Sequence, residues 1–247
     1  MKKDYQHYVF DLYGTLVDIR TDEEDPRLWA GFARYLNLLG LPVEESALRD
    51  RYIRLCLDEQ ERIDWEGAGK GLEGPFEIDI LRVWRALGKE SGRTLTRRQA
   101  EGVSLVFRAL SLQKLRVFPG AKELLQALRA RGKKTYLLSN AQASFTRPEL
   151  RQLGLDAAFD ALFISSDAGV KKPSPDFFRL LRQAGCVPEA SVMVGNDPRC
   201  DCQGAADAGM DSYYIHTEQS PARGPALPRN CREIAALTDL LPPGVSL

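Results

Sequence analysis

The segment Asp11-Leu12-Tyr13-Gly14-Thr15 places a carboxylate, a phenol and a hydroxyl within five residues. It follows the apolar run Tyr8-Val9-Phe10, which is typical of a buried strand. Gly14 supplies the backbone freedom that a tight turn needs. A carboxylate exposed at the carboxyl end of a strand is a candidate covalent nucleophile. The segment therefore predicts that Asp11 attacks an electrophilic phosphorus or carbon atom.

A carboxylate that attacks a negatively charged phosphate needs a cation beside it, and Lys172 is the candidate. Pro173 biases the backbone of Lys172 towards an extended conformation, and a lysine binds phosphate as a point charge. The alternative is an ordinary surface lysine. Ser139, which Asn140 follows, could donate a hydrogen bond to a phosphate oxygen.

Two further carboxylates, Asp197 and Asp201, lie four residues apart in Gly195-Asn196-Asp197-Pro198-Arg199-Cys200-Asp201. Together with Asp11 they could hold Mg²⁺, which prefers a few oxygen ligands, retained waters and substrate phosphate. The alternative is that one of them only caps the following helix. That alternative is reasonable for Asp201 alone but not for both acids.

The elements that must position these residues fall into two patterns. From Asp25 to about Arg116 apolar residues recur at helical spacing with no convincing strand, and Thr96 with Gln99 fits a helix-starting capping box. We therefore expect a helical insert from about 20 to 115. Beyond it, helices alternate with four short apolar runs, at Thr135–Leu138, Ala161–Ile164, Ser191–Val194 and Ser212–Ile215. This alternation predicts a parallel sheet with helices on both faces.

The polar candidates follow these runs directly, and the carboxyl ends of parallel strands meet at one edge of the sheet. Asp11, Ser139, Asn140 and Asp197 are therefore expected to lie close together. Loop polarity explains any one of these positions, but it explains the set less well.

Composition narrows the class of protein. The 247 residues carry 34 basic and 34 acidic side chains, so we expect neither nucleic acid nor a membrane surface as a partner. No stretch approaches the ~20 apolar residues of a membrane span, and no secretion signal is evident. The five cysteines are an odd number at scattered positions, which favours the reducing cytoplasm over a disulfide framework. Cys200 and Cys202 lack the histidines or second pair that structural zinc needs.

In order along the chain, the segments around Asp11, Ser139, Lys172 and Asp197 resemble the four motifs of the haloacid dehalogenase-like hydrolase superfamily. The resemblance covers about 1–18 and 117–220. It implies a doubly wound, Rossmann-like α/β core formed by 1–18 and 117–247. The helical insert, 19–116, sits where that family keeps its cap.

The resemblance also implies a role for each position. Asp11 would be the nucleophile, and the Tyr13 carbonyl a metal ligand. The transferring group would be held by three catalytic side chains, Thr15, Ser139 and Lys172, and the substrate would also contact Gly14 and Asn140. Mg²⁺ would be bound by Asp11, Tyr13, Asp197 and Asp201. If Asn196 takes the usual ligand position instead, Asp197 does not bind the metal directly but contacts the residues that do.

Tyr13 departs from the phosphatase pattern, in which a second Asp protonates the leaving group. A phenol with a pKa near ~10 does this poorly. The family's 2-haloacid dehalogenases carry Tyr at this position, use no metal, and place a cap arginine near the halide, for which Arg34 and Arg51 are available. Those dehalogenases favour Ser and Asn in the fourth motif, whereas this chain keeps Asp197 and Asp201.

We therefore predict first a Mg²⁺-dependent phosphatase that acts on a small phosphorylated metabolite through an aspartyl-phosphate. A metal-free 2-haloacid dehalogenase is the second hypothesis. The third is a catalytically weak protein that binds a phosphate ligand or regulates. The sequence leaves the substrate and the oligomeric state open.

Overall fold

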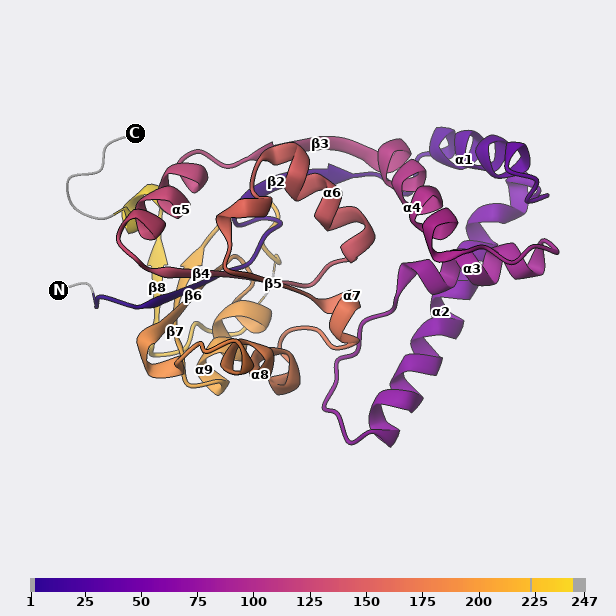
Figure 1. Cartoon of the computed structure of the whole chain (residues 1–247). Helices are drawn as coiled ribbons and strands as arrows, with labels where there is room; N and C mark the ends of the chain where they lie inside the picture. Colours follow the sequence, from indigo (N-terminus) through magenta and orange to yellow (C-terminus); the bar gives the residue numbers. More distant parts are fainter. Residues whose placement is uncertain (1–2, 223, 242–247) are drawn as a thin grey trace.

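The centre of the molecule is a six-stranded parallel sheet, shown in Figure 1. The computed structural model describes residues 3–222 and 224–241. Across the sheet the strands run β5 (Ala161–Ile164), β4 (Lys134–Ser139), β1 (His7–Phe10), β6 (Ser191–Gly195), β7 (Asp211–Ile215) and β8 (Cys231–Ile234). Every neighbouring pair is parallel. The predicted doubly wound α/β core is confirmed, and β1 lies in its interior between β4 and β6.

Helices cover both faces of this sheet. Figure 1 shows α5 (Ala121–Ala130) and α6 (Ala143–Leu153) on one face, and α8 (Pro175–Gln183) with α9 (Gly204–Asp207) on the other. Side chains of β1 alternate between the two cores, because Tyr8 and Phe10 pack in one cluster and Val9 in the other. Burial on both faces explains why the central strands read as continuous apolar runs.

The helical insert folds into four helices beside the sheet: α1 (Pro26–Leu38), α2 (Glu45–Gly69), α3 (Ile80–Glu90) and α4 (Arg97–Ser111). The predicted capping box is confirmed, since Thr96 and Gln99 bond reciprocally at the start of α4. Trp84, Phe32 and Phe107 pack edge to face or tilted in a core of their own. None of the described helices is long and apolar enough to cross a membrane.

Three strands were not anticipated. The expectation of no strand between Asp25 and Arg116 is wrong, because β3 (Leu112–Val117) pairs antiparallel with β2 (Val17–Thr21). This ribbon, which joins the insert to the sheet in Figure 1, is half exposed and rich in charge, so it lacks an apolar signal of its own. The edge strand β8 is weakly apolar for the same reason. Pairing with partners elsewhere in the chain defines these three strands, which local periodicity cannot show.

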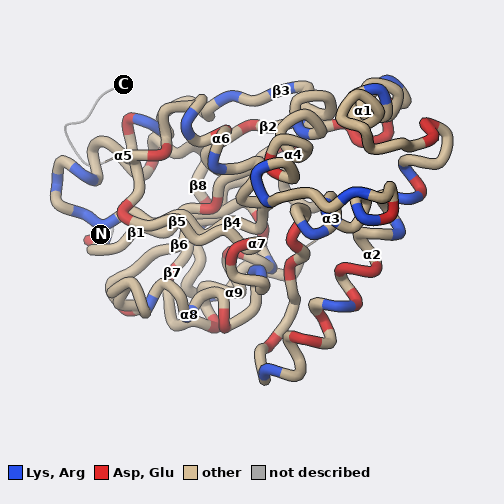
Figure 2. The backbone as a smooth tube through the Cα atoms, turned by 45° about the vertical axis from the view of Figure 1, so that its right-hand side comes forward, with Lys and Arg blue, Asp and Glu red and all other residues tan. Residues whose placement is uncertain are grey.

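Charges of both signs are mixed along the helices, as Figure 2 shows for α2. Within α2, Arg62 pairs with Glu59 and Glu66, and Arg54 pairs with Asp58. These pairs lie one helical turn apart, where opposite charges support an exposed helix. Acidic and basic side chains are thus balanced along this helix as well as in the whole chain.

Candidate active site

Asp11 directly follows β1, and a backbone hydrogen bond to the neighbouring strand fixes its position. Its N–H donates to the carbonyl of Val194 on β6, at 3.0 Å. The chain then turns at Gly14, whose φ is +84°. A Cβ at Gly14 would lie 2.2 Å from the side-chain nitrogen of Asn196, so only glycine lets the two loops approach this closely. The turn therefore brings the first and fourth motifs into contact.

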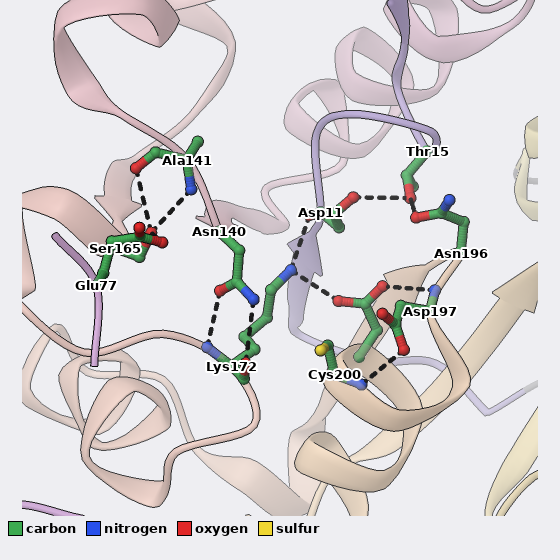
Figure 3. A network of polar contacts seen from close by, with 11 residues as sticks. Asp11, Thr15, Glu77, Asn140, Ala141, Ser165, Lys172, Asn196, Asp197 and Cys200 are labelled. Atoms are coloured by element: carbon green, nitrogen blue, oxygen red, sulfur yellow. Dashed lines mark hydrogen bonds and ion pairs between the residues drawn. The ribbon is translucent and has the colours of Figure 1, made fainter. Parts of the chain in front are cut away.

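Lys172 bridges two carboxylates, as Figure 3 shows. Its Nζ donates to Asp11 Oδ1 at 2.8 Å and to Asp201 Oδ1 at 2.7 Å, and the lysine is only 2% exposed. Burial alone would lower the pKa of Lys172, but the two carboxylates outweigh it and raise that pKa. Burial raises the pKa of Asp201 to about 6, against the opposing effect of Lys172. A permanent ammonium therefore faces the candidate nucleophile.

The second motif, Ser139-Asn140, fixes this lysine and leaves one hydroxyl unpartnered. Asn140 accepts from the Lys172 N–H at 2.8 Å and donates to the Lys172 carbonyl at 3.0 Å, so its side chain fixes the backbone of the lysine. Ser139 is 1% exposed, and its hydroxyl has no hydrogen-bond partner among the described residues. A buried hydroxyl without a partner is costly unless a ligand completes it. The Ser139 hydroxyl is therefore available to donate the predicted hydrogen bond to a phosphate oxygen.

The fourth motif divides its polar side chains between two tasks. Asp197 accepts from the N–H groups of Arg199 and Cys200 at 2.8 and 2.9 Å, and so caps the helical turn at Pro198–Gln203. Thr15 donates to Asp11 at 3.1 Å and approaches the Asn196 side-chain carbonyl at 3.3 Å. The helix cap is thus Asp197 and not Asp201, whereas Asn196 approaches the Thr15 hydroxyl that binds Asp11 (Figure 3).

The oxygen atoms around Asp11 suit a hard cation. Its carboxylate and the Asn196 amide oxygen both approach the Thr15 hydroxyl, and oxygen is the ligand type that Mg²⁺ takes. Two carboxylates and one ammonium, from Asp11, Asp201 and Lys172, leave one net negative charge. Within residues 3–222 and 224–241, no three His, Cys, Asp or Glu side chains form a ready metal cluster. A metal here would therefore need amide, main-chain, water or phosphate oxygens as well.

Tyr13 turns its hydroxyl towards α6. It donates to Glu149, and its oxygen lies 3.1 Å from the Thr146 hydroxyl. Burial, followed by the Glu149 carboxylate, raises the pKa of Tyr13 above its ordinary value of 10. The phenol is therefore protonated at neutral pH and already committed to partners.

Several residues that contact the site lie outside the four sequence motifs. The linker between α2 and α3 pairs with the loop that carries Lys172: the Lys171 N–H donates to Pro75, and the Glu77 N–H donates to Gly169, both at 3.0 Å. The Glu77 carboxylate accepts from Ser165 at 2.9 Å, beside the second motif (Figure 3). These residues are joined only by the tertiary fold, because they lie about 90 positions apart in sequence.

The loop after β7 also reaches the site. Thr217 donates to the carbonyl of Gly14 at 2.9 Å, and its hydroxyl lies 3.5 Å from the Asn196 side-chain nitrogen. Its position just beyond a strand end is the single sequence signal that could have drawn attention to it. Thr217 thus supports the turn that follows Asp11.

Comparison with known proteins places these residues in a family. Residues 5–209 match the haloacid dehalogenase-like hydrolases. A 5'-nucleotidase from Pseudomonas aeruginosa is 30% identical over 96% of this chain and 96% of its own length. A glyceraldehyde 3-phosphate phosphatase from Methanothermobacter thermautotrophicus is 32% identical over 51% of this chain, a match that spans 56% of that relative. The solved 2-haloacid dehalogenase from Pseudomonas syringae shares the fold, with a TM-score of 0.62 at 22% identity and 96% coverage of both chains.

Proposed function

This chain belongs to the haloacid dehalogenase-like hydrolases, and we propose that it is a Mg²⁺-dependent phosphatase of small phosphorylated metabolites. Two groups carry the proposal: the buried Lys172 ammonium, which binds Asp11, and the unpartnered Ser139 hydroxyl at the carboxyl end of β4, the strand that pairs with β1. A cation and a hydrogen-bond donor beside a carboxylate nucleophile suit a negatively charged phosphoryl group. Phosphatases and nucleotidases among the relatives support the same reaction class.

In the proposed reaction Asp11 attacks phosphorus, the bond to the leaving oxygen breaks, and an aspartyl-phosphate forms. Water then attacks the phosphorus of this acyl phosphate, its bond to the Asp11 oxygen breaks, and the carboxylate returns as inorganic phosphate is released. Thr15, Ser139 and Lys172 hold the phosphoryl oxygens through both steps. Mg²⁺, when bound, neutralises phosphate charge; Asp11 and Asn196 would hold it, with the Tyr13 carbonyl and Asp201 as further predicted ligands.

The leaving group sets the expected substrate preference. The Tyr13 hydroxyl is bound to Glu149 and its pKa is raised, so Tyr13 does not take over the proton donation that a second Asp performs in related phosphatases. Esters whose leaving alcohol needs no assistance should therefore react fastest. We expect p-nitrophenyl phosphate to be hydrolysed faster than an alkyl phosphate.

A panel of phosphate esters assayed with and without Mg²⁺ tests the function. We expect phosphate release that needs Mg²⁺ and that Asp11→Asn abolishes, since the amide is not a nucleophile. A matched control is Asp156→Asn, an acid in the short helical turn after α6 that bears no proposed role. Phosphate release that survives in Asp11→Asn would exclude this mechanism.

The ligand choice in the fourth motif has its own test. Because Asn196 approaches Thr15 beside Asp11 while Asp197 caps a helix, Asn196→Ala should raise the Mg²⁺ concentration needed for half-maximal activity at least about 10-fold. Asp197→Ala should instead lower stability by about 1 kcal/mol, with a smaller effect on the Mg²⁺ requirement. The reverse pattern would assign the metal to Asp197.

A 2-haloacid dehalogenase is the second candidate, because Tyr13 stands where such enzymes carry tyrosine. Of the two cap arginines considered for halide binding, Arg51 is occupied by an ion pair with Glu90 at 2.7 Å. Halide release from 2-haloacids without metal, together with no phosphate release from the panel, would favour this candidate.

We also propose that residues 1–18 with 117–247 form the catalytic core and that 19–116 form the cap. The ribbon of β2 and β3 crosses both boundaries and would act as the connection between the two parts. All five cysteines are free thiols, which suits the proposed location in the reducing cytoplasm.

A further inference from the structure

One carboxylate joins the turn after Asp11 to the helical insert. Glu149, on α6, accepts at Oε2 from the Tyr13 hydroxyl and at Oε1 from Nε of Arg108, the latter at 2.7 Å. Arg108 belongs to α4, so the two oxygens bind partners on opposite sides of the junction. Tyr13 lies 95 positions before Arg108 in the chain, and Glu149 comes later still, yet the three residues form one continuous network.

The network is held in a protected environment. The Glu149 side chain is 6% exposed and that of Arg108 is 16% exposed. The Arg108 guanidinium carbon also lies 4.7 Å from the ring centre of Phe145 and 5.9 Å from that of Tyr13. Loss of either charged partner would leave a buried charge uncompensated, so the arrangement resists rearrangement.

Phe145 extends the same junction through apolar contact. It belongs to α6, yet it packs in the aromatic cluster of the insert, with its ring centre 6.5 Å from that of Phe107. Because α6 is anchored to the insert in this way, Glu149 can transmit the position of α4 to Tyr13. Tyr13 in turn lies two residues from Asp11 and two from Thr15.

We propose that Glu149 is a positioning residue: it binds Tyr13 and Arg108 together, so that the nucleophile turn and the cap helix α4 keep one relative arrangement. In this assignment the Tyr13 hydroxyl anchors the turn and does not donate a proton to the leaving group. The kinetic tests rest on the proposed phosphatase function, whereas the exchange test below does not.

Leaving-group dependence separates an anchor from an acid. If Tyr13 donated a proton, Tyr13→Phe would slow hydrolysis of glycerol phosphate far more than that of p-nitrophenyl phosphate, whose leaving group needs no proton. For an anchor, kcat should fall about 10-fold for both esters, because the misplaced turn affects the attack itself. Tyr35→Phe, in the insert core, is the matched control for loss of a hydroxyl. A loss that differs more than about 10-fold between the esters would overturn the assignment.

Variant combinations test whether the three residues act through Glu149. Tyr13→Phe and Arg108→Met should each reduce kcat, and the two together should be no worse than the more severe single variant. In a Glu149→Gln background this coupling should disappear. Arg108→Lys should recover part of the loss, because it keeps the charge. Arg147→Met is the control, since Arg147 lies on α6 with Glu149 but forms an exposed ion pair with Asp167. Losses that multiply independently would refute a shared function.

Hydrogen–deuterium exchange reads the network without any substrate. Glu149→Gln and Tyr13→Phe should speed amide exchange in both α4 and the residues 11–17, whereas Arg147→Met should leave both segments unchanged. Unchanged exchange at residues 11–17 in Glu149→Gln would overturn the proposal, whatever the activity. Altered exchange in a protein that hydrolyses no phosphate ester would retain the positioning role and reject the phosphatase function.

Discussion

Replacement of Lys172 by methionine tests the centre of the site most directly. Methionine keeps an unbranched side chain of similar length but removes the ammonium that lies 2.8 and 2.7 Å from the carboxylates of Asp11 and Asp201. Removing one partner from a buried ionic cluster costs about 3–5 kcal/mol. The two carboxylates then face each other without a cation, so the pair should take up a proton and share it.

The pH dependence follows from where that proton is bound. In the native protein the pKa of Asp201 is raised to about 6. The ionisation of Asp201 therefore lowers the free energy of unfolding progressively up to about that pH and by a constant amount above it. In Lys172→Met the raised pKa moves higher, and the folded state then binds more protons than the unfolded state. The free energy of unfolding should therefore fall with rising pH, by about 1.4 kcal/mol for each pH unit above about 6.

Urea unfolding of both proteins at about pH 6, 7 and 8 measures this slope without metal or phosphate. The native protein should be nearly flat, while Lys172→Met should lose about 2.7 kcal/mol across the two units. The double variant with Asp201→Asn is the matched control, because it removes one of the two carboxylates and should restore the flat profile. Parallel profiles for the native protein and Lys172→Met would refute the reasoning.

Three further changes probe other parts of the fold. Gly14→Ala places a side chain 2.2 Å from Asn196 at a φ of +84°, and we expect kcat/KM to fall about 100-fold; near-native kinetics would contradict the close approach. Phe107→Ala empties the core of the insert and should lower the free energy of unfolding in urea by about 3–5 kcal/mol; a loss below about 1 kcal/mol would contradict that packing. Burial alone would raise the pKa of Asp18, but Lys114 and Arg116 outweigh it and lower that pKa below 3.8. Asp18→Asn should therefore cost about 1 kcal/mol at neutral pH, a difference that thermal unfolding should find lost as the pH falls through the lowered pKa.

The sequence by itself determined the layered α/β core, because that information is local. An apolar run of four residues buried on both faces of a sheet needs no knowledge of its partners, and polar residues beyond each run mark the carboxyl edge. Asp11 and Ser139 are predicted in this way, whereas Lys172 is predicted from the cation that a phosphate needs and from the Pro173 that follows it. The ribbon at Leu112–Val117 was missed, since a half-exposed strand is defined by its partner rather than by its own pattern.

The tertiary structure decided how the identified residues are used. Asn196 and Asp197 are neighbours that both offer oxygen ligands, and only the start of the next helix commits Asp197 to a cap while Asn196 approaches Thr15 beside Asp11. From the sequence alone, Tyr13 indicates only that the second Asp of the first motif is replaced. Its hydrogen-bond partner, Glu149, lies 136 residues away and is known only from the structure. A side chain's role depends on the direction in which the backbone points it and on what fills the space there. Both are set by packing between distant segments, which spacing along the chain does not encode.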